Sequence, residues 1–229
     1  MERVIFVIET RPRAKVARPV RNAKRPSDAR IPRIRRLRRA ELPRDTIELS
    51  RYLIGKTLVH KLPAGRVSGR IVETEAYPTG DASAHAFRGL TASNRSLFLE
   101  RGHAYVYFTY GSCFCMNVSA ETEGVGGGVL IRAVEPIEGI ELMEQNRGTK
   151  VLRDLTRGPG RLAAAMGIDK RVDGLDLCSE GLLWLGSAVK RAGAIGESVR
   201  IGITKEVEHL RRFFERGNPF VSGLKRLNQ

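Results

Sequence analysis

Two short segments of the chain carry side chains that could do chemistry on a flat ring. Residues 70–77 read Arg-Ile-Val-Glu-Thr-Glu-Ala-Tyr, and residues 105–111 read Tyr-Val-Tyr-Phe-Thr-Tyr-Gly. Both have the composition of β-strands, in which alternate side chains project to the same face. We therefore expect Glu75 and Tyr77 to share one face, and the first two tyrosines of the second segment to share another. A cavity lined by tyrosines and one carboxylate suits a planar ring.

Glu75 is the residue best suited to chemistry in such a cavity. The ordinary pKa of a glutamate is about 4.3, so its carboxylate is ionised at neutral pH. An ionised carboxylate can deprotonate a water molecule and stabilise the positive charge that develops on a sugar as an N-glycosidic bond breaks. Taken alone, however, a glutamate on a strand is more often a salt-bridged side chain, and lone tyrosines on a strand are more often core.

The motifs together resemble those of the 3-methyladenine (alkyladenine) DNA glycosylase family. The resemblance covers roughly Leu42 to Phe220. Six segments stand in the family's order and close to its spacing: residues 69–77, Ala84-His85, Asn94-Arg95, residues 105–111, Cys115-Met116-Asn117 and residues 129–136. It implies a base-excision repair enzyme that flips out an alkylated or deaminated purine, such as 3-methyladenine, 7-methylguanine, hypoxanthine or ethenoadenine, and leaves an abasic site.

The resemblance assigns the chemistry and the base pocket to named positions. Glu75 would activate the attacking water, and Arg132 would help to hold that water. Tyr77 and Tyr107 would stack on the flipped base, with His85 as a third wall.

Other positions would contact the edge of the base and the DNA. Asn117 would touch the base and disfavour guanine through its exocyclic amine, and Tyr110 would intercalate where the base has left the stack. The family commonly has an arginine where this chain has Ser93, and Arg88 and Arg95 lie close enough in sequence to substitute. The implied partner is double-stranded DNA containing a damaged purine, and a single DNA face favours a monomer.

No cofactor is expected. No lysine or amino-terminal amine occupies a matching place in the motifs, so we expect a monofunctional hydrolase that does not cleave the strand by Schiff-base chemistry. Cys113 and Cys115 could be imagined as a zinc site with His85 and His103. Their spacing is not that of a zinc loop, and we expect them to be buried as small hydrophobic side chains.

Two other classes of protein fit part of the pattern. A noncatalytic nucleic-acid-binding module would stack single-stranded bases on the tyrosines and make no demand on Glu75 or Asn117. A metal-dependent nuclease would need a cluster of carboxylates, which Glu73, Glu75 and Asp81 do not clearly form from sequence. Sensitivity to EDTA would separate the nuclease from a metal-free glycosylase.

The positive charge of the chain is concentrated at one end. The 229 residues carry a formal charge of +15, of which residues 1–39 supply +11 from 14 basic and 3 acidic residues. Such a block predicts a disordered basic tail over residues 1–40, with a DNA glycosylase domain at 41–229. The functional alternative is a tether that adds phosphate contacts without reading sequence. The lack of a long apolar run and the odd number of three cysteines favour a soluble, cytoplasmic protein.

The order of elements predicts an α+β fold, a single domain with a curved, largely antiparallel sheet flanked by helices. We expect a helix capped by Asp45 or Thr46 and ended by Gly55. We expect strands at 56–62, 105–110, 113–119, 129–133 and 199–204, and a strand that follows a turn at 63–65 and ends at Tyr77. Further helices are expected from Pro136 to Arg147 and from Gly158-Pro159 to Ala165.

Overall fold

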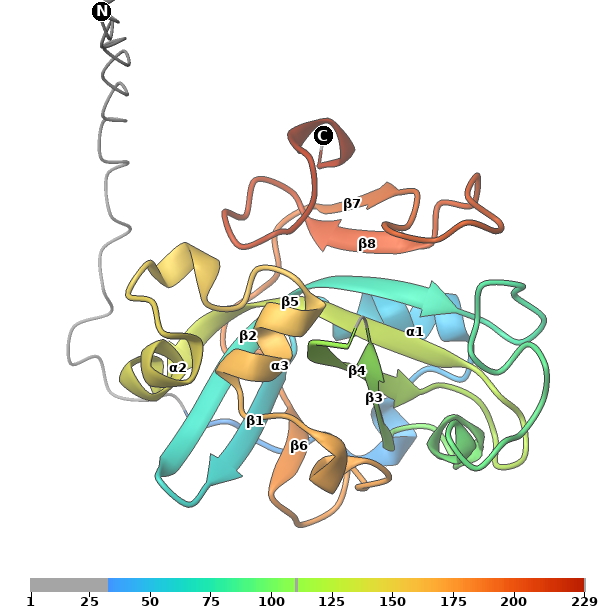
Figure 1. Ribbon diagram of the computed structural model, residues 1–229, viewed down its shortest axis with the longest axis horizontal. Helices are drawn as coiled ribbons and strands as arrows, with labels where there is room; N and C mark the ends of the chain where they lie inside the picture. Colours follow the sequence, from blue (N-terminus) through green and yellow to red (C-terminus); the bar gives the residue numbers. More distant parts are fainter. Residues whose placement is uncertain (1–32, 110, 229) are drawn as a thin grey trace, which may run out of the picture.

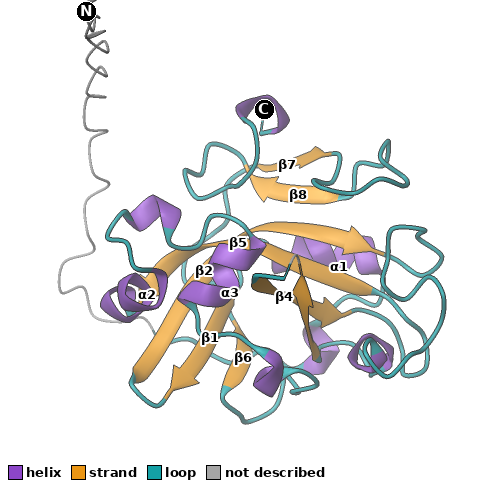
Figure 2. Cartoon of the chain, in the orientation of Figure 1, coloured by secondary structure: helices purple, strands orange, loops and turns teal. Residues whose placement is uncertain are grey.

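The structure is a computed structural model that describes residues 33–109 and 111–228. Within them, eight strands form one antiparallel sheet that curls around a core, with three α-helices against it (Figures 1 and 2). The strands are β1 (Thr57–Leu62), β2 (Gly65–Tyr77), β3 (Ala104–Thr109), β4 (Cys113–Ser119), β5 (Gly128–Glu138), β6 (Leu183–Gly186), β7 (Ile195–Ser198) and β8 (Arg212–Glu215). The helices are α1 (Thr46–Leu53), α2 (Ile140–Arg147) and α3 (Pro159–Ala165). The predicted α+β class and single domain are confirmed.

Strand β2 is the longest strand and organises the sheet. One of its edges pairs with β5 along most of its length. The other edge pairs with β1 up to Arg70 and then with β8 at residues 73–75. The residues that follow Arg70 therefore lie where β2 changes partner, between the main sheet and the β7–β8 pair that Figure 1 shows above it.

Two register shifts interrupt the pairing of β2 with β5 at this junction. Ile71 pairs with Val134 and Glu73 with Ala133, so Val72 is an extra residue on β2. The next pair is Thr74 with Ile131, which leaves Arg132 as an extra residue on β5. Bulges of this kind re-aim side chains and are common beside functional sites.

Local signals of sequence place helix α1 as predicted. The Asp45 side chain accepts hydrogen bonds from the backbone N–H groups of Ile47 and Glu48, and so caps the first turn. Gly55, at φ +85°, provides the left-handed turn that ends the segment. Leu49 and Leu53 are fully buried in the main core.

Two predicted elements were wrong. Pro136 does not begin a helix: β5 runs on to Glu138, and α2 begins only after Gly139 at φ +73°. Pro136 pairs with Gly69 beside a register shift, a place where the missing N–H of proline is tolerated. Residues 199–204 are not a strand, because their alternating isoleucines face a cavity rather than a neighbouring strand.

The packed chain begins before the predicted boundary near Glu41. Arg36 forms a β-bridge with Gly186, and its guanidinium lies over the Trp184 ring. Leu37 is buried in the main core, with its N–H bonded to the Leu185 carbonyl. The rest of the predicted tail, residues 1–32, lies outside the described residues. In the described part of the chain, no helix has the length and apolar character needed to cross a membrane.

Candidate active site

A cavity of about 370 Å³ opens at the end of the sheet where β2, β3, β4 and β5 meet two long loops. Residues of the strands and of the loops before η2 (Arg95–Phe98) and before β8 form its walls. The residues that line it include Tyr77, His85, Tyr107, Asn117, Arg132 and Lys205. Its size and its mixture of rings and a few polar groups suit a small planar ligand.

The carboxylate of Glu75 lies fully buried behind this cavity and is held by three donors. Its Oε2 accepts from the Tyr77 hydroxyl at 2.9 Å and from Arg132 Nη1 at 3.2 Å. Its Oε1 accepts from the backbone N–H of Ile201 at 2.8 Å. All three donor residues line the cavity. An ionised carboxylate offers about four acceptor positions, so one position on Oε1 stays open for a further donor such as water.

Arg132 is fixed by a second carboxylate, that of Glu73. Because Glu73 and Glu75 stand two apart on β2, they share a face, and Arg132 reaches both from the bulge on β5. Arg132 donates to Glu73 through Nε at 2.8 Å and to Glu75 through Nη1. The burial of its guanidinium is outweighed by the two carboxylates, which raise the pKa of Arg132. The arginine is therefore a permanently charged group that points at the catalytic candidate.

The Glu73 carboxylate is itself held by four donors. It accepts from Arg212 Nε at 2.8 Å, from the Ser222 hydroxyl at 2.8 Å and from the Ser222 N–H at 2.6 Å, besides Arg132. Burial opposes its ionisation, but the charges of Arg132 and Arg212 and the Ser222 N–H outweigh burial and lower the pKa of Glu73. Four donors thus hold Glu73, three on Oε1 and one on Oε2, and Glu73 in turn fixes Arg132.

Three aromatic rings form one wall of the cavity. Tyr105 and Tyr107 stack with ring centres 5.4 Å apart and planes 23° from parallel. His85 meets Tyr107 edge-on at 4.4 Å and its Nδ1 lies 2.9 Å from the Tyr105 hydroxyl. Burial raises the pKa of Tyr105 to about 12 and lowers that of His85, so both groups are neutral at pH 7. The wall presents aromatic surface without charge.

Tyr77 forms the facing part of the site and is backed by Arg200. The Arg200 guanidinium carbon lies 4.6 Å from the Tyr77 ring centre, and the guanidinium forms a bidentate ion pair with Asp81. Arg211 also binds Asp81, at 2.8 Å. The Ala82 N–H donates to Glu206 at 3.0 Å. These bonds tie the loop after β2 to the loop before β8, which together close one side of the cavity.

Asn117 is positioned on β4 with its side chain toward the cavity. It pairs with Tyr105 on one side and with Leu130 on the other. It is only 7% exposed, and no other side chain or backbone group in the described ranges forms a hydrogen bond with its amide. The amide is therefore available to a ligand. Cys115 also lines the cavity, and burial raises the pKa of its thiol to about 11.

The glycine run on the opposite side is explained by close packing. A β-carbon on Gly126 would stand 2.6 Å from Ala86 and from the Phe98 ring, and one on Gly128 would stand 2.7 Å from Leu97. Only glycine lets this backbone approach the loop that carries His85. The run thus shapes the cavity rather than supplying a flexible turn.

The structure brings together most of the residues that the sequence predicted for the site. Tyr77, His85, Tyr107, Asn117 and Arg132 all line one cavity, with Glu75 bonded to two of them. Arg88 lines an adjoining cavity instead, and Arg95 is exposed at the start of η2. Tyr110 lies outside the described residues.

Several residues of the site were missed from sequence. Glu73 could have been found, because it shares a face of β2 with Glu75. Arg212 and Ser222 reach Glu73 from 139 and 149 residues away, and no local pattern announces such contacts. Lys205 lines the cavity, although the motifs suggested no lysine near the chemistry. Among the described residues, no group of three or more His, Cys, Asp or Glu side chains is arranged to hold a metal ion.

The fold and the cavity define a class of enzyme with a buried carboxylate beside an aromatic cage. Residues 40–219 match the model of a protein family described as Methylpurine-DNA glycosylase (MPG). The chain belongs to this family, and it is a DNA glycosylase, an enzyme that hydrolyses N-glycosyl bonds.

Similar proteins from bacteria and archaea support the assignment. A protein of Mesorhizobium japonicum is 62% identical over 191 residues, which cover 83% of this chain and 92% of that protein. A protein of Paraburkholderia phytofirmans is 53% identical, covering 83% and 90%. A protein of Methanocella arvoryzae is 46% identical, covering 79% and 95%. Each is named as a candidate 3-methyladenine DNA glycosylase.

Proposed function

We propose that this enzyme flips alkylated or deaminated purines out of duplex DNA and hydrolyses their N-glycosidic bond with a water activated by Glu75. The substrate class is that of 3-methyladenine, 7-methylguanine, hypoxanthine and ethenoadenine. The observation that carries the proposal is the Glu75 carboxylate, held by Tyr77, Arg132 and the Ile201 N–H directly behind a cavity of aromatic rings. The names of the relatives fit the first of these substrates.

The arrangement separates the tasks of the reaction. Tyr77 on one side and the His85–Tyr107 wall on the other offer ring faces to a flipped base, and each such stack is worth about 1 to 3 kcal/mol. A water on the open position of Glu75 would lie beside a carboxylate, a group that can remove its proton and stabilise an oxocarbenium-like sugar. Arg132 binds the carboxylate and fixes its direction.

Asn117 supplies the selectivity in this proposal. Its amide, free of partners among the described residues, faces the cavity at the edge of a base lying between the rings. The side chain occupies the space beside the base edge, where an additional substituent on the base would have to fit. The exocyclic amine of guanine would meet this side chain and be disfavoured.

The product in this proposal is an abasic site with an intact strand. Lys205 makes this a point to test, since a lysine amine at a cavity wall could attack the sugar and form a Schiff base. Lys205 is exposed at the rim, and its backbone carbonyl accepts from the Ser83 hydroxyl. Glu75 lies fully buried behind the cavity. We therefore assign the attack to water and not to Lys205.

The decisive experiment is single-turnover base release in EDTA from duplex DNA carrying hypoxanthine or 1,N6-ethenoadenine. The native chain should release the base. Glu75→Gln should lower the rate by about 10²- to 10⁴-fold and still bind the DNA. Borohydride should trap no covalent adduct with the native chain or with Lys205→Ala. Binding without release by the native chain, from these substrates and from 3-methyladenine DNA, would refute the proposal.

A further inference from the structure

A second cavity, of about 740 Å³, adjoins the base cavity. The two share Ala82, Ala84, His85, Tyr105, Tyr107 and Lys205 in their walls. They are therefore neighbours separated by the aromatic wall, and nothing in the proposed reaction uses the second one.

Aromatic rings in this second cavity face solvent. Phe87 is 50% exposed and Phe108 is 56% exposed. Phe108 packs against Phe114 across the β3–β4 pair, with ring centres 5.1 Å apart. Rings of this size exposed together beside a cavity mark a binding surface. Their free faces are suited to stacking on another planar ring.

Positive charge accompanies these rings. Arg88, Lys170 and Lys205 line the cavity, and no aspartate or glutamate lies among its lining residues in the described chain. Lys170 is held by Asp173 at 2.8 Å. Arg88 and Lys205 have no ion pair with any residue of 33–109 or 111–228. Unpaired cations beside exposed rings complement a nucleotide, which combines a planar base with a phosphate.

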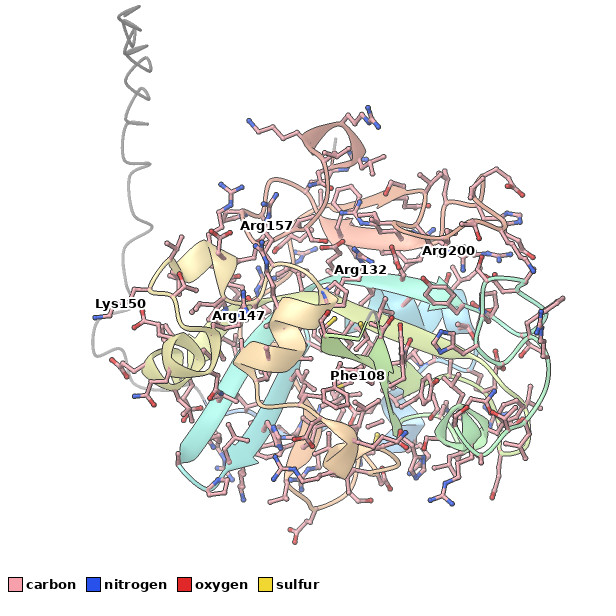
Figure 3. All side chains as sticks on the ribbon, in the orientation of Figure 1. Phe108, Arg132, Arg147, Lys150, Arg157 and Arg200 are labelled. Carbon is pink, nitrogen blue, oxygen red and sulfur yellow. The ribbon has the colours of Figure 1, made fainter. Side chains whose placement is uncertain are left out.

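The course of β3 explains where the second cavity opens. β3 is the edge strand of the sheet, and residues 170–176 cover the first part of its free edge. The Ala104 N–H donates to the Leu175 carbonyl and the Val106 N–H to Asp173, both at 2.8 Å. Phe108 lies two residues past this cover, and Figure 3 shows its side chain on the β3 side of the site that holds Arg132. The cavity thus begins where the covered edge ends.

We propose that the second cavity binds the nucleotide that neighbours the flipped one on the same DNA strand. Its base stacks on Phe108 or Phe87, and its phosphate lies near Arg88 and Lys205. The inference rests on the proposed function, because a flipped base in the first cavity brings its strand neighbour to the shared rim. The second base is held by stacking alone, so its identity is not read.

A cycle of substitutions in protein and DNA tests this contact. The DNA is a duplex with one hypoxanthine, in which the neighbouring nucleotide on the 5′ or the 3′ side is replaced by a baseless tetrahydrofuran. Binding is measured in the Glu75→Gln background, because this variant leaves the hypoxanthine in place. The phenylalanines are either kept or both replaced, by Phe87→Ala and Phe108→Ala. Loss of the base on one side should weaken binding at least fivefold when both phenylalanines are present. The same loss should have no effect in the alanine variant.

Matched variants show whether this dependence of binding on the neighbouring base, here called the coupling, belongs to the second cavity. Phe108→Tyr should keep the coupling, since it keeps a ring. Leu182→Ala removes an apolar side chain of similar exposure, 56%, at the β6 end of the sheet, and should leave the coupling intact. The second site would be overturned if loss of the neighbouring base, on either side, changed binding equally in the protein with both phenylalanines and in every variant.

Excision measured in parallel separates the two proposals. The Phe87→Ala, Phe108→Ala variant of the otherwise native chain should release hypoxanthine within about twofold of the native rate at saturating enzyme. Normal release with no coupling would overturn the second site and leave the proposed function standing. Coupling in the binding assay without any base release by the native chain would support the second site and refute the glycosylase chemistry.

Discussion

The guanidinium of Arg200 covers the ring of Tyr77, with its central carbon 4.6 Å from the ring centre. Figure 3 shows Arg200 and Arg132 at the boundary between the main sheet and the β7–β8 pair. One face of the ring is taken by the cation, and the other is left for the cavity. Because the Asp81 carboxylate neutralises Arg200, the ring is fixed without adding net charge behind the cavity.

Arg200→Met should destabilise the protein strongly. The variant keeps a side chain of similar length but leaves Asp81, whose side chain is fully buried, without its bidentate partner. Removing one partner of a buried pair costs about 3 to 5 kcal/mol. Urea unfolding measures the loss, and adding Asp81→Asn should recover part of it. Full additivity of the two substitutions would mean that the pair is not coupled.

Glu73→Gln should impair catalysis without touching the substrate. Arg132 and Arg212 lose the carboxylate that holds them, and displacement of a catalytic arginine partner by about 1 Å can cost about 10²-fold in rate. The single-turnover rate should fall at saturating enzyme, while DNA binding changes little.

A matched variant distinguishes this positioning role from general damage. Ser222→Ala removes the hydroxyl bond to Glu73 and keeps the backbone N–H bond. It is the mild control and should cost about 1 kcal/mol of stability. It should keep most of the single-turnover rate, whereas Glu73→Gln should not. An unchanged single-turnover rate in Glu73→Gln would contradict the role.

Stability should fall in acid through Asp81. Burial opposes its ionisation, but hydrogen bonds from Arg200, the Ser83 N–H and Arg211 prevail, and the pKa of Asp81 is lowered. A lowered folded-state pKa gives stability that is complete above the unfolded value, about 3.9, and is lost as the pH falls toward the folded value. The free energy of unfolding should therefore decline below about pH 4. Asp81→Asn should flatten this decline, and an unchanged slope would exclude Asp81 as its source.

Asn117→Ser should relax discrimination against undamaged guanine. The shorter side chain leaves space for the exocyclic amine at the edge of the base. The ratio of hypoxanthine to guanine release should fall by at least about tenfold, because a polar contact at a base edge is worth roughly 1 to 3 kcal/mol. An unchanged ratio would remove Asn117 from substrate selection. Hypoxanthine release itself serves as the internal control for folding.

Two truncations should separate the contribution of amino-terminal charge to DNA binding from the contribution of amino-terminal packing to stability. Residues 1–32 carry nine basic and three acidic residues. Their deletion should weaken DNA binding at low salt and reduce its salt dependence, with excision at saturating enzyme intact. Deletion of residues 1–39 also removes Leu37, which is 1% exposed, and should cost about 2 to 5 kcal/mol of stability. Loss of excision after deletion of residues 1–32 would show that these residues do more than supply charge for DNA binding.

The parts of the molecule that local chemistry determines could be predicted from the sequence. Alternation along β2 put Glu75 and Tyr77 on one face, and their side chains form a hydrogen bond. Asp45 and Gly55 marked the ends of α1. The same reasoning failed at Pro136, because pairing with β2 prevails over the preference of proline for a helix start.

Other parts of the site depend on contacts between distant segments. Residues 199–204 alternate like a strand, yet their isoleucines line a cavity and the Ile201 N–H is used on Glu75. Asp81 and Arg200 are 119 residues apart, and each looks like an ordinary surface charge in its own segment. Arg132 needed the bulge on β5 to reach two carboxylates at once, and a bulge leaves no mark in the hydrophobic pattern.

The bonds between Ser222 and Glu73 join segments that are synthesised far apart in time. Strands β2 to β5 can pair as soon as they have emerged from the ribosome, since their partners are close in sequence. The anchor of Arg132 stays incomplete until Arg212 and Ser222 arrive, and long-range contacts of this kind form late. If Glu75 and Arg132 act as proposed, a nascent chain that already contains β2 to β5 still lacks a fixed Arg132. We therefore expect activity only after the segment that contains Arg212 and Ser222 has been synthesised.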